Sequence, residues 1–514
     1  MSIGEKASQG FFGFLTRNII SRFMGLISLF ILAHKLSPYD FGLVSFTEIL
    51  LSFIAVFGST GINEFLLAYK KDDFNEIIKA TFWLNVILTI SMMTIFFIFV
   101  PFWAESKHDS RIIWLGLISG ITFFITQMQI IPKAILARKL DFKATVKIQN
   151  PFIIIVPIAK IIAALSGMGV YSLIVPTLIF MPFQTLWFYR AVKWKIEWEM
   201  LRNRWKEIYN FSKHLIGNSL LTRMMDDGDK FILSAFLGLE TLGVYNMAYQ
   251  LSSFVGTNIV SLTNTILTSV LPKYRNDLPK MKEHLLTFIK VLAFFTFPII
   301  MLMTVFAEPM IIAVNGEKWL SVVVPFQILS IYALIRSVTS NTGAVLNTLH
   351  LNRISFKLIL IYAPIHILSS IVFSYYYGII GVAASVCVLR FIFALIGMNV
   401  TMKAIGGNVK EFIMKLATPF KITALLMICC STILYVLPFD FINQKFLNVF
   451  NLKLNNISAI VYFAFLFSIG IFLFIFIVRF FFRKDIQDIS KFLYQSSAKI
   501  GNIYNKVFAL RPIK

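Results

Sequence analysis

The chain has 514 residues and a net charge of +23, with 58% hydrophobic and only 14% charged residues. Ordinary soluble domains contain about 25% charged residues, so this composition excludes a water-soluble globular domain and indicates an integral membrane protein. Apolar stretches of about 20 residues recur along the whole chain and are continuous rather than alternating, which favours membrane-spanning helices over a β-barrel.

The hydropathy pattern predicts an all-α membrane protein with about fourteen spanning helices. In chain order these cover residues 10–33, 41–64, 79–101, 111–132, 146–165, 169–190, 209–236, 240–271, 284–307, 319–347, 355–377, 379–402, 417–437 and 457–482. If both termini are cytoplasmic, most basic residues lie on the cytoplasmic side, as the positive-inside rule requires. The opposite side then holds only Lys35, Lys107, Arg111, Lys318, Lys445 and Lys453. The net charge therefore reflects topology, and we expect no nucleic acid partner.

The first predicted helix contains Arg17 and Arg22, and Asn18 lies one turn before Arg22 on the same face. Charged residues inside a span are costly in lipid and normally face a bundle interior or a wet cavity. Four arginines fall near the middle of a predicted span: Arg22, Arg223, Arg336 and Arg390. Arg17 is nearer the cytoplasmic end, so its side chain could instead extend to the membrane interface.

The segment "KWKIEWEMLRNRWKE" at 193–207 divides the chain near its centre. Trp194, Trp198, Leu201 and Trp205 would share one face of a helix, with basic residues over much of the rest. This pattern predicts a helix that lies in the headgroup region. An irregular cytoplasmic linker is the alternative.

An internal repeat relates the two halves. "KLSPYDFGLVSF" (35–46) and "FLGLETLGVYNM" (236–247) both join a helix end to the start of the next helix. Superposing Gly42 on Gly243 places Arg22 on Arg223. Two further pairs of similar segments follow in the same order along the chain, and they align Phe142 with Phe356 and Gly169 with Gly381. Such a parallel repeat of six helices is typical of transporters whose substrate path lies between two lobes.

The repeat predicts the domain organisation. We expect a six-helix lobe over 1–192, a cytoplasmic interfacial linker over 193–208, a second six-helix lobe over 209–402, and two extra helices with a basic cytoplasmic tail over 403–514. No CxxC, HExxH or phosphate-loop signature is present, and the three cysteines lie in apolar stretches. We therefore expect no enzymatic activity, no metal site and no cofactor.

At this point the sequence resembles a known family. The run from Asp229 to Tyr245 and "LSPYDFG" after the first helix are similar to the polysaccharide transporter family, which includes Wzx-type flippases of the multidrug/oligosaccharidyl-lipid/polysaccharide superfamily. The resemblance implies a fold like that of multidrug exporters of this superfamily. It also implies alternating access and transfer of an undecaprenyl-diphosphate-linked oligosaccharide, such as an O-antigen repeat unit of lipopolysaccharide, across the bacterial cytoplasmic membrane.

The resemblance further implies cationic residues in a central cavity and, in several members, ion coupling. Arginine suits a diphosphate because it stays charged and can bind phosphate through two parallel hydrogen bonds. We expect diphosphate contacts at Arg22, Arg223, Arg336, Arg390 and Arg17, sugar contacts at Asn18, Asn218 and Asn264, and coupling to H⁺ or Na⁺ at Glu48, Asp226, Asp227 and Asp229. The expected partners are the lipid-linked glycan, membrane lipids and the polysaccharide polymerase or glycosyltransferase machinery, with the chain acting as a monomer.

Two alternatives stay open. Asp227 lies four residues after Arg223, and Asp226 lies four residues before Lys230, so this helix could neutralise its own charges. Arg22 could likewise pair with Glu48 or Glu64 of the second helix. The second alternative is a cation-coupled multidrug exporter of the same superfamily, although a pocket for cationic drugs should contain few central arginines.

Overall fold

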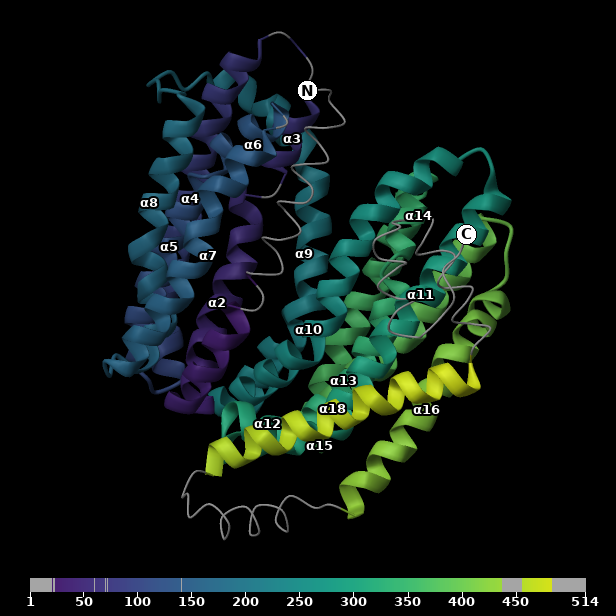
Figure 1. Cartoon of the computed structure of the whole chain (residues 1–514). Helices are drawn as coiled ribbons and strands as arrows, with labels where there is room; N and C mark the ends of the chain where they lie inside the picture. The colour runs from purple at the N-terminus through teal and green to yellow at the C-terminus, as the bar shows by residue number, and fades with distance from the viewer. Residues whose placement is uncertain are drawn as a thin grey trace. The chain divides into compact units, whose positions relative to one another are not determined.

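The computed structural model describes residues 21, 24–59, 61–69, 71, 73–139, 141–436 and 455–482; the side chains of residues 59, 257–266, 268–270, 352 and 455–458 are not described. Every regular element in these ranges is helical, and ten segments are long and apolar enough to span a membrane (Figure 1). The chain is thus a multi-pass, all-α membrane protein, as predicted. The count of about fourteen spans and the cytoplasmic termini stay predictions.

Four predicted spans are not among these ten segments. Residues 10–33 lie mostly outside the described part of the chain. Two others correspond to the long helices α9 (Trp205–Phe236) and α10 (Gly238–Val270). The last difference is only in the count: α15 (Asn352–Ala404) joins two helices across a kink at Gly378, whose φ of 58° and ψ of −144° are not helical, and these two helices correspond to the predicted spans 355–377 and 379–402. Glycine adopts this backbone conformation without steric cost.

The chain divides into two compact units, residues 1–246 with 363–375, and residues 247–362 with 376–514. In unit 1, α2 packs against α4, α5 and α9, and α8 packs against α5 and α7 (Figure 1). Besides a short helix at Met24–Lys35, this unit contains α2 (Pro38–Ser59), α3 (Ile62–Ala68), α4 (Phe74–Ser106), α5 (Arg111–Gln127), α6 (Ile130–Arg138), α7 (Phe142–Leu165), α8 (Val175–Val192) and α9, with 3₁₀ turns at Gly169–Leu173 and Arg202–Arg204.

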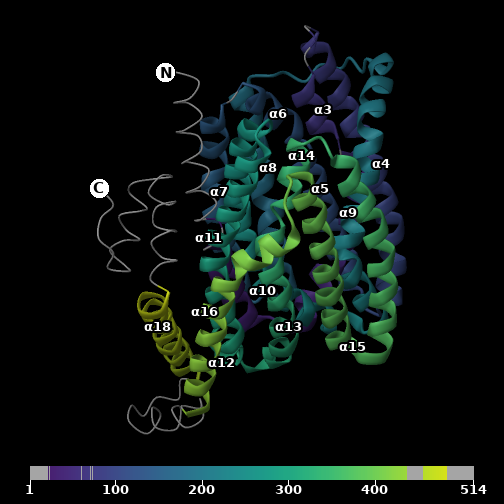
Figure 2. The same ribbon diagram turned by 90° about the vertical axis from the view of Figure 1, so that its right-hand side faces the viewer.

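Unit 2 is organised around α11 (Leu278–Val305), which packs against both α13 and α16. Its other helices are α12 (Ala307–Asn315), α13 (Val323–Thr339), α14 (Thr342–Thr348), α16 (Val409–Val436) and α18 (Asn455–Phe481), with 3₁₀ turns at Leu271–Tyr274 and Glu317–Val322. In Figure 2, α18 lies beside α16, and both helices share an apolar core with α11.

The two units differ from the predicted lobes, whose limits of 1–192 and 209–402 stay a prediction. Helix α9 contacts α2, α3 and α4, so it belongs with the helices of unit 1. Helix α10 also begins in unit 1 and passes into unit 2 after Asn246. The division into these two units thus follows the packing of the helices.

The two glycines that align the repeat contact one another. A Cβ at Gly42 would overlap the carbonyl oxygen of Leu239, and a Cβ at Gly243 would overlap that of Pro38. Nearby, Asn246 donates a hydrogen bond to Ser45 Oγ at 2.6 Å. Gly42–Gly243 and Ser45–Asn246 each join positions 201 residues apart, and the contacts Gly42–Leu239 and Gly243–Pro38 are reciprocal at the same offset. A two-fold axis that passes between Gly42 and Gly243 produces this reciprocal pattern, in agreement with the alignment of the halves.

Both halves also break a helix at the same place. Helix α5 ends at Gln127 and α6 begins at Ile130, and α13 ends at Thr339 and α14 begins at Thr342. The spacing between the two breaks equals the spacing between Gly169 and Gly381. The predicted spans 111–132 and 319–347 each correspond to one candidate membrane span, Arg111–Arg138 and Glu317–Thr348, so both breaks are interruptions within a span. Breaks at corresponding positions are common in transporters built from repeats.

The linker is not the interfacial helix that its tryptophan spacing predicts. Residues 193–201 are not helical, and regular structure resumes only at Arg202–Arg204 and then α9. The irregular alternative is therefore the one observed. The reason is that its tryptophans dock on α4 separately: Trp194 on Phe82 at 5.3 Å between ring centroids, Trp198 on Trp83 at 5.1 Å, and Trp205 Nε1 donating to the Ala80 carbonyl at 3.1 Å.

At one end of unit 1, a polar network fixes the start of α2. Tyr39 OH donates to Asp109 Oδ2 at 3.1 Å, and Arg111 Nη2 lies 2.7 Å from the same oxygen. Burial alone would raise the pKa of the Asp109 carboxyl, but hydrogen bonds from Arg111 and Tyr39 outweigh burial and hold this pKa below its usual value. The network anchors the helix that carries one wall of the site.

Candidate functional site

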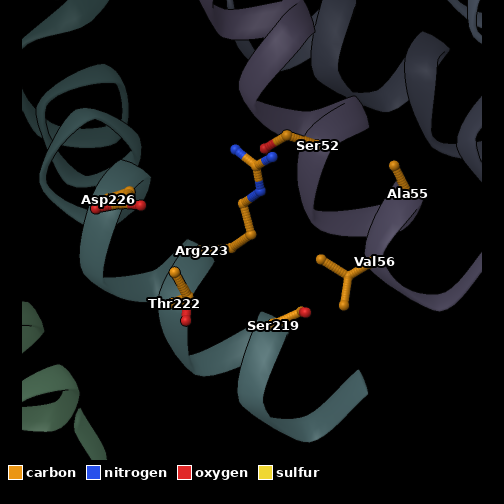
Figure 3. Close-up of a pocket in the computed structure, with 7 residues that line it drawn as sticks. All are labelled: Ser52, Ala55, Val56, Ser219, Thr222, Arg223 and Asp226. Carbon is orange, nitrogen blue, oxygen red and sulfur yellow. The ribbon is translucent and has the colours of Figure 1, made fainter. Parts of the chain in front are cut away.

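A polar pocket of about 330 Å³ opens between α2 and α9 in unit 1 (Figure 3). Its walls are Ser52, Ala55 and Val56 of α2, and Ser219, Thr222, Arg223 and Asp226 of α9. On α9 these positions recur every three or four residues, so they occupy one face of the helix. We call this the α2–α9 pocket. The pocket explains how α9, which carries several charges, packs among apolar helices: its charged face lines the cavity.

Arg223 is the cation of this pocket. Its side chain is 49% exposed, and its guanidinium extends from α9 toward Ser52 (Figure 3). Nη1 lies 3.3 Å from Asp227 Oδ2, which confirms the predicted pairing four residues along the helix. A guanidinium has five N–H donors. One ion pair at this distance leaves most of them able to reach a ligand in the pocket.

Asp227 holds a second cation. Lys230 Nζ lies 2.7 Å from Asp227 Oδ1, and both residues are over 90% buried. Removing two charges from water costs free energy that only close pairing offsets. One carboxylate is thus shared between a buried lysine and a half-exposed arginine, although this short stretch of α9 contains two basic residues and three acids in total.

Asp229 accepts hydrogen bonds and does not share the ion pairs of Asp227. Its Oδ2 accepts a hydrogen bond from Tyr245 OH at 2.6 Å, and its Oδ1 accepts one from the Lys230 backbone N–H at 2.9 Å. Asp229 is 2% exposed and Tyr245 is fully buried. Because Tyr245 belongs to α10, this bond ties α9 to α10. These two residues also begin and end the most specific sequence motif, and the bond between them gives that motif a structural reason.

Glu48 extends the polar surface along α2. It is exposed although the residues on either side of it are buried, and it lies one turn before Ser52. Glu48 is within electrostatic range of Lys160 on α7 and of Lys230 and Asp227 on α9. Acidic and basic groups from three helices therefore interact inside unit 1.

Unit 2 contains a second cationic cluster. Arg336 Nη1 donates to Tyr249 OH at 3.3 Å, and its guanidinium lies 6.0 Å from the Tyr332 ring centroid. The Arg390 guanidinium lies 5.4 Å from the Tyr332 ring and 4.9 Å from the Tyr362 ring. Two arginines thus converge on Tyr332, and aromatic faces stabilise their charges at these distances.

Unit 2 also has an apolar pocket of about 680 Å³ between α11, α13 and α16. Most of its wall is aliphatic, with Met301, Ile331 and Leu434 as examples. Gln327 supplies a polar group and donates to the Thr304 carbonyl at 3.3 Å.

The remaining predicted site residues are placed unevenly. Arg17, Asn18 and Arg22 lie outside the described residues, as does the side chain of Asn264 in α10. Asn218 is exposed on α9, and its carbonyl accepts a hydrogen bond from Thr222. In unit 1 the structure brings Arg223, Asp226 and Asp227 to one part of α9, while Arg336 and Arg390 belong to unit 2.

The sequence analysis did not include several groups that lie beside the candidate site residues. Lys160 and Lys230 were not assigned to the site, and the tyrosines around Arg336 and Arg390 were not considered. The three-residue spacing of Asp227 and Lys230 was a usable signal. Among the described residues, no group of three or more His, Cys, Asp or Glu side chains could hold a metal ion.

Comparison with known proteins agrees with this architecture. A family model described as "Polysaccharide biosynthesis protein" matches residues 31–324. The chain is 21% identical over 424 residues to the lipopolysaccharide biosynthesis protein WzxC of Escherichia coli, and the match covers 82% of this chain and 86% of that protein.

Two solved structures share the fold. The lipid II flippase MurJ in an inward closed conformation gives a TM-score of 0.67 at 15% identity, covering 92% of this chain and 99% of MurJ. An inward-facing multidrug resistance transporter of the MATE family gives 0.60 at 13% identity, covering 76% of this chain and 94% of that one. At these identities the structures establish the fold, which is that of membrane transporters.

Proposed function

Because the chain belongs to the polysaccharide biosynthesis protein family, we propose that it is a flippase for a lipid-linked oligosaccharide. It moves an undecaprenyl-diphosphate-linked glycan from the cytoplasmic to the outer leaflet of the bacterial inner membrane by alternating access. The observation that carries the proposal is the half-exposed guanidinium of Arg223 at a polar pocket inside the helical bundle of unit 1.

A diphosphate needs compensating charge wherever it leaves water. Arg223 supplies it, because a guanidinium remains protonated and its planar fork matches a phosphate group. The hydroxyls of Ser52, Ser219 and Thr222 line the same pocket and can donate to phosphate or sugar oxygens. A pocket for a cationic drug would instead combine aromatic walls with an acid and no competing arginine.

Asp227 provides a means of releasing Arg223. When a phosphate approaches, Arg223 exchanges its single carboxylate oxygen for phosphate oxygens, while Asp227 keeps its shorter bond to Lys230. Protonation of Asp227, or Na⁺ binding beside Asp226 and Glu48, would favour the same exchange. Ion coupling through these acids is therefore part of the proposal. Asp229 is not included, because its carboxylate already accepts a hydrogen bond from Tyr245 OH, and we assign it to the packing of α9 on α10.

Unit 2 offers complementary groups. The Arg336 and Arg390 cluster can balance negative charge, and its tyrosines can stack on sugar rings. The apolar pocket of about 680 Å³ suits part of a polyprenyl chain. Together these features supply the three things this substrate requires: charge compensation, hydrogen bonds for hydroxyls and an apolar surface for the lipid.

Replacement of Arg223 tests the proposal. We expect Arg223→Ala to reduce transport of lipid-linked glycan by roughly 10-fold or more, because a hydrogen bond to a charged group contributes about 1.5–3 kcal/mol. Transport is measured as the appearance of the glycan in the outer leaflet of proteoliposomes, at matched protein level. Arg223→Lys keeps the charge without the fork, so its residual rate shows how much of the effect needs two parallel hydrogen bonds.

Arg190→Ala is the matched control, since Arg190 is an exposed arginine at the end of α8. It should transport at the wild-type rate. A well-expressed Arg223→Ala variant with full activity would contradict the proposal. Export of cationic drugs with no glycan movement would favour the drug exporter instead.

A further inference from the structure

In the linker at 193–207, the acidic residues form ion pairs with described residues, whereas most of the basic residues do not. All three of its acids are held by basic groups of unit 1 or of the linker itself. Lys79 Nζ lies 2.5 Å from Glu197 and 3.3 Å from Glu199, and Lys71 Nζ lies 2.9 Å from Glu207. Each acid of the linker therefore has a basic partner, and Glu197 and Glu199 share the same one.

The basic residues of the linker behave differently. Arg204 alone turns inward, toward Asp73, Glu76 and Glu207. The other four are exposed, and none forms an ion pair with any residue that the structure describes: Lys193, Lys195, Arg202 and Lys206. Glu197 and Glu199 are also more than half exposed, but both are paired with Lys79, so within the described part of the chain the unpaired charges of the linker are all positive.

Large apolar side chains lie among these cations. Trp198 is 85% exposed, with its ring 5.1 Å from that of Trp83, and Ile196 is 48% exposed. A tryptophan this exposed is costly in water, but it is favoured at the boundary between headgroups and acyl chains. We define Lys193, Lys195, Ile196, Trp198, Arg202 and Lys206 as the linker surface.

The position of the linker on α4 sets its depth. Its tryptophans contact α4 at Ala80 and Trp83, and α4 is a candidate membrane span that begins at Phe74. Ala80 lies six residues into this helix, about 9 Å along its axis. The linker therefore runs along the side of α4, at its charged end, rather than across the tip of the helix. This is the level at which headgroups surround a spanning helix.

We infer that the linker surface binds the headgroups of anionic phospholipids, with Trp198 inserted at the base of the headgroup layer. A basic residue near an anionic membrane strengthens binding about fivefold, and four uncompensated cations surround one exposed tryptophan. A zwitterionic headgroup matches the tryptophan but not the charge. The inference does not depend on which substrate the chain transports.

Fluorescence quenching in nanodiscs tests the inference with the full chain. Equal fractions of phosphatidylglycerol and phosphatidylcholine are used, with bromine on the acyl chains of one lipid at a time. The Trp198 signal is the difference between wild type and Trp198→Phe, which keeps an aromatic ring beside Trp83. We expect brominated phosphatidylglycerol to quench this signal more strongly than brominated phosphatidylcholine does.

Charge variants identify the source of the preference. The triple variant Lys193→Gln, Lys195→Gln, Lys206→Gln should lose most of the excess quenching by phosphatidylglycerol. The matched control Lys139→Gln, Lys143→Gln, Lys147→Gln removes three exposed lysines near the α6–α7 turn and should keep it.

Three outcomes would overturn the inference. Equal quenching by the two lipids in wild type would mean that Trp198 is an ordinary interfacial residue. A preference that survives the triple variant would exclude these lysines as its cause. No quenching by either lipid would place the linker surface in water or against a protein. If the triple variant fails to fold, the comparison of quenching by the two brominated lipids in the wild type still tests the inference.

Discussion

Asp227 and Asp229 lie two residues apart on α9 but have different roles. Asp227 is shared between Arg223 and Lys230, so its contacts can be redistributed when an anion arrives. Asp229 accepts two hydrogen bonds and is almost fully buried, so it has no exchangeable partner. The neighbours that packing brings to each side chain, rather than the carboxylate itself, decide its role.

The Asp229 assignment predicts a stability effect. Tyr245→Phe removes the hydroxyl that donates to Asp229 and leaves a buried acceptor without this donor, which costs about 1–3 kcal/mol. We expect a lower unfolding temperature in detergent, measured by thiol-reactive fluorescence. Tyr209→Phe, at a 60% exposed position of α9, is the control and should unfold at the wild-type temperature. An unchanged Tyr245→Phe transition would mean that the bond contributes nothing.

At the scale of elements, α2 and α10 approach closely because each has a glycine at the crossing, within its first two turns. No side chain larger than hydrogen fits at Gly42 or Gly243, since the opposing carbonyl oxygen occupies the space of a Cβ. The two helix starts and the Ser45–Asn246 hydrogen bond form one reciprocal contact. The same glycines had aligned the halves of the sequence, so the repeat and this contact have a common cause.

This contact predicts opposite effects for two glycine substitutions. Gly243→Ala should lower the free energy of unfolding by about 1–3 kcal/mol, because the added methyl group forces the helices apart. Gly217→Ala is the matched control: Gly217 is helical, and a Cβ there meets nothing within 4 Å. It should be neutral or stabilising by about 0.5–1 kcal/mol, since alanine favours the helix. Denaturant or thermal unfolding measures both, and equal effects would contradict the close contact.

At the scale of the whole molecule, charge and hydropathy serve different purposes. Hydropathy predicts which segments enter the membrane, and the predicted topology would account for the surplus of basic residues. The few charges inside the helical bundle are then the candidates for a function. In unit 1 they gather on α2, α7 and α9, which is where a gradient of a small cation could act on a bound anion.

Ion coupling is therefore measurable on the intact transporter. In proteoliposomes, imposing either a proton gradient or a Na⁺ gradient should change the rate of glycan transfer, because a cation on the acids near Arg223 favours its release. Asp227→Asn should remove this response, while Glu240→Gln, an exposed acid at the start of α10, should keep it. Wild-type rates that are the same with and without both gradients would remove coupling from the proposal.

Much of this site was accessible from the sequence because helical periodicity is local. The Arg223–Asp227 pair follows from a spacing of four residues. Contacts between distant segments were not accessible: Ser52 and Arg223 line one pocket from different helices, and Tyr245 reaches Asp229 across a helix end. The linker shows the same limit, since its tryptophans have helical spacing but dock on α4 one at a time.

The sequence by itself determined the membrane class, the positions of most helices, the repeat and the charged face of α9. Each of these follows from composition or from a period of 3.6 residues, which a single helix expresses without partners. Only the tertiary structure decided that this face meets α2, that α5 and α13 are interrupted where they are, and that the acids of the linker pair with lysines of unit 1. Those outcomes depend on side chains from segments far apart in the chain, whose proximity is a property of packing.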